Sequence, residues 1–252
     1  MGTTGVPGPV TRSTLRQQIA EALRDEVLAG RLHPGQEFTV KEIAEQYGVS
    51  ATPVREALVD LSAQELLEAV QHRGFRVRAF SVEDFRHIVQ ARALISDGMF
   101  LRLAARARSG ARGFPDVAET ASLAAVRRRG EECQRAAHSG ELSVLIGYDL
   151  RYWRELSGLF GNPYLTDFLH RLRVQAWVCT VQHLRRLADL RGHMWAGHTA
   201  LVDALGRGDA EASQQLVAES NTFSLDLVER LTATDAADGS REPGRGPDGQ
   251  RG

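Results

Sequence analysis

The sequence predicts a mostly α-helical protein, in which an N-terminal winged helix-turn-helix (three helices plus a β-hairpin wing) precedes an all-α bundle of about six helices. Two observations favour this fold. Between Thr39 and Arg78 the chain changes from two helical patterns joined by a turn to two short alternating segments around a Gly-containing tip. From Ser81 onwards, apolar residues recur at helical spacing and no strand pattern competes. We therefore expect two domains, at 11–79 and 80–231.

The remaining elements follow in order along the chain. Residues 1–10 are rich in Gly, Thr and Pro and are expected to be disordered, and a first helix is expected at about 12–29. Ser81 and Asp84 have the spacing of a capping box at the start of the next long helix. Helices are then expected at about 81–108, 114–138, 141–160, 163–190, 193–206 and 209–231. The polar, Gly- and Pro-rich segment 232–252 is expected to be a disordered tail.

Composition is that of an ordinary globular protein. The 252 residues are 42% hydrophobic and 25% charged, with a formal net charge of −1. No apolar run approaches the roughly 20 residues that a transmembrane helix needs, and the N-terminus has no apolar signal core. Cys133 and Cys179 form no metal-ligand spacing. These features indicate a cytoplasmic protein with reduced thiols and no membrane partner.

The stretch after Thr39 has the internal spacing of a helix-turn-helix. Ala44 is the small residue where the two helices touch, Gly48 lies in the turn, and Val54 fills the core behind the second helix. Ser50 is the expected N-cap of that helix, because its hydroxyl can accept an otherwise unpaired N–H of the first turn. Pro53 falls in the same turn, where a missing N–H costs little.

A helix-turn-helix of this kind presents the start of its second helix to DNA. Arginine can bond guanine through two hydrogen bonds, while serine and threonine reach phosphates or base edges. The basic wing tip suits contacts with the DNA backbone or the minor groove. The expected DNA-binding residues are Thr39, Lys41, Ser50, Thr52, Arg55, His72 and Arg73. The alternative for Arg55 is an ion pair with Glu45 or Glu56 on a solvated face.

Four polar residues of the second domain lie where helical periodicity calls for apolar ones. They are Arg92, Asp149, His198 and Ser220, each on a different expected helix. A buried charge is costly unless it is paired, so their convergence would line a polar cavity of the kind in which helical bundles bind ligands. Two plainer interpretations are open: a satisfied core histidine at His198, and a buried ion pair between Arg92 and Asp149.

Residues 12–80 resemble the winged helix of GntR-family transcription regulators. The resemblance rests on GRLHPG (Gly30 to Gly35), EIAEQYGVS, TPVREAL (Thr52 to Leu58) and HRGFRV (His72 to Val77). The family usually has Arg directly after the Ser of VS, where this chain has Ala51. The resemblance implies a protein that binds a double-stranded DNA operator, with one phosphate or base contact missing.

The helical domain that follows resembles the FCD ligand-binding domain of the FadR subfamily. The resembling residues are ARALI and LRLAARA near 91–107, DLRYW at 149–153 and HTALVDALGRGDAEA at 198–212. The resemblance implies a homodimeric regulator, more often a repressor, that reads a pseudo-palindromic operator. It also implies that a small-molecule effector, bound in the helical domain, changes the affinity for the operator.

Many FCD domains bind a divalent metal through one Asp and three His. The resemblance places Asp149 and His198 at two of these positions but Trp153 and Ser220 at the others, and neither replacement is a competent ligand. We expect no metal cofactor; Asp149 and His198 would hold one if it is present, and a register shift would let His183, His193 or Glu219 complete the site.

The expected effector-binding residues are Arg92, Asp149, Trp153, His198 and Ser220. Arg92 and His198 are expected to hold an anionic group of the effector, and Trp153 to provide an apolar or stacking wall. Two rival functions remain from the residues alone. One is an enzyme that uses Asp149 and His198, although no nucleophile motif, phosphate loop or complete metal set supports it. The other is an architectural DNA-binding protein whose helical domain only dimerises.

Overall fold

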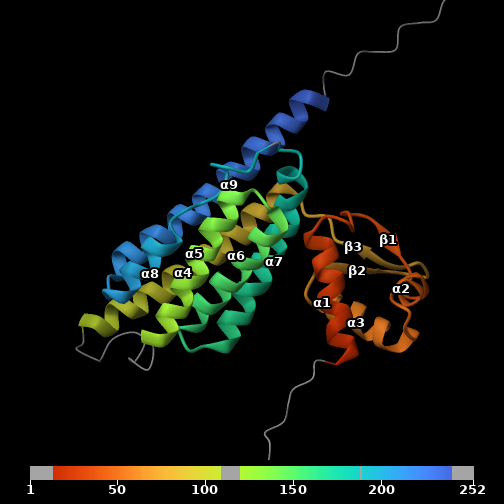
Figure 1. Cartoon of the computed structure of the whole chain (residues 1–252), viewed down its shortest axis with the longest axis horizontal. Coiled ribbons are helices and arrows are strands. Elements are labelled where there is room, and N and C mark those ends of the chain that lie inside the picture. The colour runs from red at the N-terminus through yellow and green to blue at the C-terminus, as the bar shows by residue number, and fades with distance from the viewer. Residues whose placement is uncertain (1–13, 109–119, 188, 240–252) are drawn as a thin grey trace, which may run out of the picture. The chain divides into compact units, whose positions relative to one another are not determined.

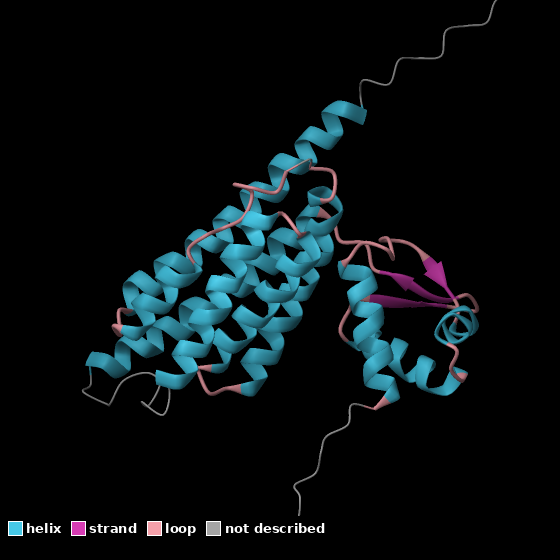
Figure 2. Cartoon of the chain, viewed as in Figure 1, coloured by secondary structure: helices cyan, strands magenta, loops and turns pink. Residues whose placement is uncertain are grey.

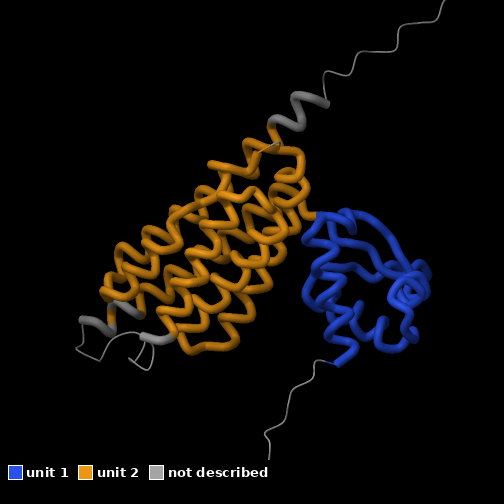
Figure 3. Tube along the Cα trace, viewed as in Figure 1, with its two compact units in different colours: residues 1–79 blue, residues 80–252 orange. Residues whose placement is uncertain are grey.

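The computed structural model describes residues 14–108, 120–187 and 189–239. The chain divides into two compact units, Met1–Ala79 and Phe80–Gly252 (Figure 3). The expected disordered segment 1–10 and most of the expected tail lie outside the described residues. Among the described helices, none combines the length and the apolar character that a bilayer span requires.

Unit 1 is a three-helix domain with a small antiparallel sheet (Figures 1 and 2). Its elements are α1 (Leu15–Leu28), β1 (Glu37–Phe38), α2 (Val40–Tyr47), α3 (Ala51–Ala63), β2 (Leu67–Val70) and β3 (Gly74–Val77). The sheet order is β1-β3-β2, with Leu67 opposite Val77 and Phe38 opposite Phe75. The predicted hairpin wing is therefore confirmed, and β1 is an additional edge strand, too short to show an alternating pattern in the sequence.

Two caps define the helix-turn-helix, and the one at Ser50 differs from the sequence-based expectation. Helix α2 begins with a capping box between Thr39 and Glu42 and ends at Gly48, whose φ of 64° places it in the left-handed region that glycine favours. Ser50 is the N-cap residue of α3, but its side chain makes no capping hydrogen bond. The expected capping contact is therefore wrong. The third helical position, a usual donor to an N-cap side chain, is Pro53, which has no N–H.

Unit 2 consists of long helices that pack side by side (Figure 1). They are α4 (Val82–Arg108), α5 (Thr120–Ser139), α6 (Leu142–Gly158), α7 (Pro163–Leu184), α8 (His198–Gly206) and α9 (Ala210–Gly239). One buried cluster includes Phe100, Tyr152 and Leu201, and a second includes Phe85, Leu172 and Val228. The predicted helical bundle is confirmed, and its core is shared among all of these helices.

Three boundaries in unit 2 differ from the sequence-based expectation. Helix α7 ends at Leu184 rather than near 190, and α8 begins at His198 rather than near 193, because the intervening segment contains Gly192 with φ 76°. Helix α9 continues to Gly239, so the expected tail does not begin at 232. The sequence from 232 to 238 contains no proline or glycine to stop the helix before Gly239.

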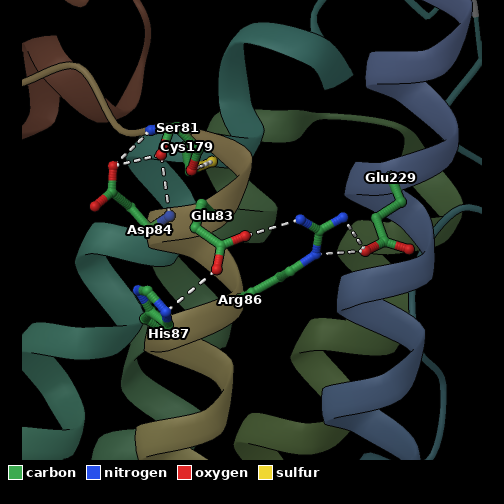
Figure 4. A network of polar contacts seen from close by, with 7 residues as sticks. All are labelled: Ser81, Glu83, Asp84, Arg86, His87, Cys179 and Glu229. Atoms are coloured by element: carbon green, nitrogen blue, oxygen red, sulfur yellow. Dashed lines mark hydrogen bonds and ion pairs between the residues drawn. The ribbon is translucent and has the colours of Figure 1, made fainter.

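The start of α4 is fixed by a polar network (Figure 4). The hydroxyl and backbone N–H of Ser81 both donate to Oδ2 of Asp84, at 2.7 and 2.9 Å, and the Ser81 hydroxyl accepts from the Asp84 N–H at 3.1 Å. The predicted capping box is confirmed. One turn later, Arg86 donates to Glu83 at 3.0 Å and to Glu229 of α9 at 2.9 Å, which ties the first turns of α4 to the last long helix.

Candidate functional site

The candidate DNA-binding surface of unit 1 surrounds the start of α3. Val54, Ala57 and Leu58 point into the core and are fully buried, so the opposite face of α3 carries Arg55 outward. The side chains of Lys41, Ser50, Thr52, Arg55, His72 and Arg73 are exposed, and Thr39 is half-buried. A shallow surface pocket between α2 and α3 is lined by residues that include Thr39, Lys41 and Arg55. Three of the expected DNA-binding residues therefore line the same surface pocket.

Arg55 is available for an external partner. Within the described residues it forms no ion pair with a carboxylate, and the Glu45 side chain instead lies 3.8 Å from the ammonium of Lys41. The Thr39 hydroxyl is engaged by the cap, since it accepts from the Glu42 N–H at 3.2 Å and donates to the Glu42 carboxylate at 3.0 Å. The outward face of α3 thus offers an unpaired guanidinium of the type that reads guanine.

The wing tip is shaped by backbone geometry. His72 has φ 62°, and Gly74 has φ 110° with so little space that an added Cβ would lie 2.4 Å from the carbonyl oxygen of Phe38. Arg73 projects from this tip with 73% of its side chain exposed, and its guanidinium lies 3.9 Å from Glu37. Such a distant exposed pair contributes little energy, so Arg73 can move to a phosphate.

The other wing arginines are more firmly engaged. Arg76 donates to Glu68 at 3.1 Å, and Arg78 donates to Glu65 at 2.8 Å. The tip is therefore the part of the wing with the most loosely held positive charge.

Unit 2 encloses a cavity of about 60 Å³, which we call the first cavity. Its polar lining includes Arg92 of α4, Asp149 of α6, Arg173 of α7, His198 of α8 and Ser220 of α9. Four of the five expected effector-binding residues therefore meet there. Trp153, the fifth, lines a neighbouring cavity of about 40 Å³, the second cavity, which shares Arg92 and Arg173 with the first.

Asp149 is held by donors on both of its carboxylate oxygens. The indole N–H of Trp153 donates to Oδ1 at 3.0 Å, and that of Trp177 donates to Oδ2 at 2.6 Å. The Nε atom of Arg173 lies 3.7 Å from Oδ2, and Nε2 of His198 lies 3.9 Å from Oδ1. Burial alone would raise the pKa of Asp149, but the positive charge of Arg173 and these hydrogen bonds outweigh it and lower the pKa to about 2.

Sequence reasoning missed Arg173 and Trp177. Both lie on α7, which is buried on nearly every side from Leu172 to Val181, so the helix has no clear apolar face against which a polar residue stands out. The spacing of four residues between Arg173 and Trp177, which places both side chains on one helix face, was the available signal.

Arg92 is buried with an incomplete set of partners. Its Nη2 donates to Oδ1 of Asn221 at 2.8 Å, while Nη1 has no hydrogen-bond partner among the described residues. Asp149 pairs with Arg173, so the alternative of a buried ion pair between Arg92 and Asp149 is wrong. Burial lowers the pKa of Arg92 well below its ordinary range, and the nearby charge of Arg173 adds to this effect against the attraction of Asp149.

His198 begins α8, and its ring lies beside Asp149. Its side chain is buried, and its Nδ1 atom has no hydrogen-bond partner within the described part of the chain. Its backbone carbonyl accepts a hydrogen bond of 2.8 Å from the hydroxyl of the fully buried Tyr152, which fixes the first residue of α8 against α6. The ring is therefore held in place with one nitrogen left for a ligand or water.

The donor set around Asp149 does not fit a divalent metal. Among the described residues, no three His, Cys, Asp or Glu side chains gather in a metal-binding arrangement. His183, His193 and Glu219 are absent from the lining of the first cavity, so the register shift that would recruit them is not seen. Both oxygens of Asp149 face indole N–H groups, which are donors and cannot coordinate a cation.

Comparison with known proteins places both units in one family. Residues 15–77 match the family described as "Bacterial regulatory proteins, gntR family", and residues 87–221 match the FCD domain. The match to the FCD domain includes Arg92, Asp149 and His198, and that to the gntR family includes Arg55 and Arg73.

Individual relatives agree with this placement. The chain is 30% identical to a probable D-xylose utilization operon transcriptional repressor of Paenarthrobacter nicotinovorans, over 81% of this chain and 84% of the relative. It is 36% identical to the HTH-type transcriptional regulator Mce2R of Mycobacterium tuberculosis (strain CDC 1551 / Oshkosh), over 85% and 93%. The solved structure of E. coli McbR/YncC has the same fold, with a TM-score of 0.68 at 21% identity over 88% of this chain and 100% of that one.

The expected rival function as an enzyme is set aside, because the matched families and the relatives are transcription regulators. The protein binds DNA through unit 1, and its affinity for the operator is modulated by a small molecule bound in unit 2. The chain belongs to the GntR family of bacterial transcription regulators, in the FadR subfamily that carries an FCD domain.

Proposed function

We propose that this regulator is a cytoplasmic homodimeric repressor that binds a pseudo-palindromic operator and responds to an anionic effector without a metal ion. Arg55 at the start of α3 reads the major groove of each half-site, and Arg73 of the wing holds the DNA backbone. One winged helix spans only a half-site, so tight and specific binding needs two copies.

An exposed apolar face on α4 supports the dimer. Leu94 and Leu101 are 67% and 65% exposed, and they lie seven residues apart on one side of the helix. Gly98 lies between them with nothing within 4 Å of the position of a Cβ, so a second helix can approach closely there. The occupant that we assign to this face is the α4 helix of a second copy, which would bury both leucines.

The single observation that carries the anionic effector is the unpartnered Nη1 of buried Arg92. The two guanidinium groups of Arg92 and Arg173 lie in the walls of both cavities, and Asp149 is the only carboxylate among the described residues that line them. Asp149 already forms an ion pair with Arg173. A bound anion therefore supplies the charge that Arg92 lacks, at a buried position where such a pairing is strong.

Selection from a pool of random duplex DNA by the full-length protein tests the DNA-binding part. We expect an inverted repeat whose half-sites lie about one helical turn, or a multiple of it, apart. Native mass spectrometry of the protein–DNA complex should find two protein chains bound to each duplex. A single unrepeated site bound by one chain would contradict the proposal.

The selected duplex then tests the effector part. In the presence of a chelator, at least one of a panel of small anions (acetate, benzoate and inorganic phosphate) should change the affinity for the duplex. D-xylose serves as the neutral comparator, because one relative is named for a xylose operon. If no anion of the panel alters operator binding, the anionic effector is contradicted, whatever the result of the selection.

A further inference from the structure

The first residue of α3 has a small apolar side chain on the face that carries Arg55. Ala51 begins α3 and is exposed, and Arg55 lies four residues later, one turn along the same face. A helical side chain leans towards the N-terminus of its helix. The guanidinium of Arg55 therefore extends over the turn that begins at Ala51, and the two residues face neighbouring base pairs when α3 lies in a major groove.

The chemistry of Ala51 restricts what it can recognise. Its methyl side chain neither donates nor accepts a hydrogen bond, so it cannot read the donors and acceptors by which most base edges differ. In the major groove, the 5-methyl group of thymine is the apolar group that distinguishes one base from the others. The methyl group of Ala51 matches it in size and character, and contact between the two removes both from water.

The surface beside Ala51 is apolar as well. The apolar residues that line the surface pocket between α2 and α3 are Val40, Ala44, Val49 and Ala51. Arg55 also lines this pocket, and so does Lys41, whose ammonium lies 3.8 Å from the carboxylate of Glu45. A thymine methyl group next to the base that Arg55 bonds therefore meets apolar atoms, and no polar group has to give up its water there.

We infer that Ala51 is a specificity-determining residue, which reads the 5-methyl group of a thymine next to the base pair read by Arg55. The contact selects thymine at one position of each half-site, and it acts through dispersion and the exclusion of water rather than through a hydrogen bond. This inference rests on the proposed function, since it needs α3 to lie in the major groove with Arg55 towards the bases.

Deoxyuridine provides a direct test, because it differs from thymidine only by the absence of the 5-methyl group. Each thymine of the selected duplex is replaced in turn, at the same position of both half-sites, and the affinity of the full-length protein is measured by fluorescence anisotropy at fixed salt. Arg55→Ala, titrated against single-base variants of the duplex, locates the base pair that Arg55 reads. One replacement beside that pair should weaken binding of the wild type by about fourfold per half-site, which is the effect of burying one methyl group.

Ala51→Gly removes the methyl group on the protein side of the same contact. The measured quantity is the ratio of the affinities for the thymine duplex and the deoxyuridine duplex, in which the fraction of folded protein cancels. This ratio should fall close to one in Ala51→Gly. Ala63→Gly is the matched control, since Ala63 is the exposed last residue of α3 and the substitution costs the helix a similar amount. Its ratio should equal that of the wild type.

The outcomes separate this inference from the proposed function. If Arg55→Ala leaves the base preference unchanged, the proposed reading by α3 and this inference both fall. If Arg55 reads a base pair but no neighbouring thymine depends on its methyl group, or if Ala51→Gly keeps the wild-type ratio, this inference alone is overturned. Should Ala51→Gly fail to fold, Ala51→Ser takes its place. It must lower the same ratio, because its hydroxyl would lose water against the methyl group.

Discussion

The indole N–H of Trp177 donates to Oδ2 of Asp149 across a distance of 2.6 Å, and so joins α7 to α6 at the centre of unit 2. Trp153 donates to the other oxygen of the same carboxylate at 3.0 Å. The arrangement keeps a negative charge buried beside Arg173, and each carboxylate oxygen accepts a hydrogen bond from an indole N–H. Asp149 is therefore a structural anion in this protein, which has consequences for its stability and its metal content.

The first prediction concerns the pH dependence of stability. The pKa of Asp149 is lowered from its ordinary value of 3.8 to about 2 in the folded protein. A group whose pKa is depressed on folding stabilises the native state above its unfolded pKa, and this contribution is lost as the pH falls through the folded pKa. Asp149→Asn should therefore lose stabilisation on the order of 2 kcal/mol near neutral pH.

Urea unfolding of the wild type and Asp149→Asn between pH 7 and pH 2 measures this contribution. The difference in unfolding free energy should stay constant above about pH 5 and shrink between about pH 4 and pH 2. A difference that stays the same down to the lowest pH would show that Asp149 is not ionised in the folded protein.

The second prediction is that the protein, as purified, carries no stoichiometric zinc, nickel or manganese. Trp153 and Ser220 occupy two of the positions expected for ligands, and the indole of Trp153 donates to Asp149 instead of coordinating. Elemental analysis of the wild type and His198→Ala provides the measurement. One equivalent of a transition metal per chain, lost in His198→Ala, would mean that other side chains complete a metal site.

The third prediction concerns sequence reading by α3. Arg55→Ala should weaken binding to the operator by about 1–3 kcal/mol and relax the base preference at one position of each half-site, because the exposed guanidinium is placed to bond guanine. Gel-shift titrations at fixed salt, against the selected duplex and its single-base variants, measure both effects. Unchanged affinity would remove Arg55 from the reading surface.

Arg73→Ala is the contrasting variant for this experiment. Its exposed guanidinium on the wing tip suits a phosphate, so its loss should weaken binding to all duplexes by a similar factor and reduce the dependence of affinity on salt concentration. A change in base preference with an unaltered salt slope would instead assign Arg73 to base reading.

The fourth prediction tests the assigned dimer face. The double variant Leu94→Glu/Leu101→Glu should shift the full-length protein from dimer towards monomer in sedimentation experiments, because it places charges where two copies of α4 would bury leucine. Val59→Glu is the matched control, since Val59 is 54% exposed on α3 of unit 1. An unaffected dimer in the double variant would move the interface away from this face of α4.

The winged helix could be predicted in detail because its determinants are local. The capping residue Thr39, the left-handed Gly48 and the periodic Val54, Ala57 and Leu58 act within a few residues of one another. The failure at Ser50 is also local, since Pro53 removes one of the N–H groups that its hydroxyl would meet. Strand β1 could not be predicted, because a strand of two residues gains its stability from pairing with β3 rather than from its own sequence.

The cavity could be predicted only in part. Arg92, Asp149 and His198 were found because each interrupts an otherwise apolar stripe. Arg173 could not be predicted, because α7 is buried on nearly every side and no polar residue stands out on it. Asn221 could not be predicted, because its hydrogen bond is to Arg92, which lies far from it in the chain. Which of these residues pair with one another is determined by the packing of the five helices that carry them, and helical periodicity carries no information about that.

The most direct test of this account is a comparison of wild type and Arg92→Met in binding to the selected operator, with and without a saturating concentration of the panel anion that alters operator binding, and with a chelator present. Methionine keeps much of the buried volume without the charge. By fluorescence anisotropy, both proteins should bind the duplex with the same affinity in the absence of the anion. The anion should release the wild type from the operator and leave Arg92→Met bound. An equal response of the two proteins to the anion would contradict the claim that an anion held by Arg92 controls operator binding.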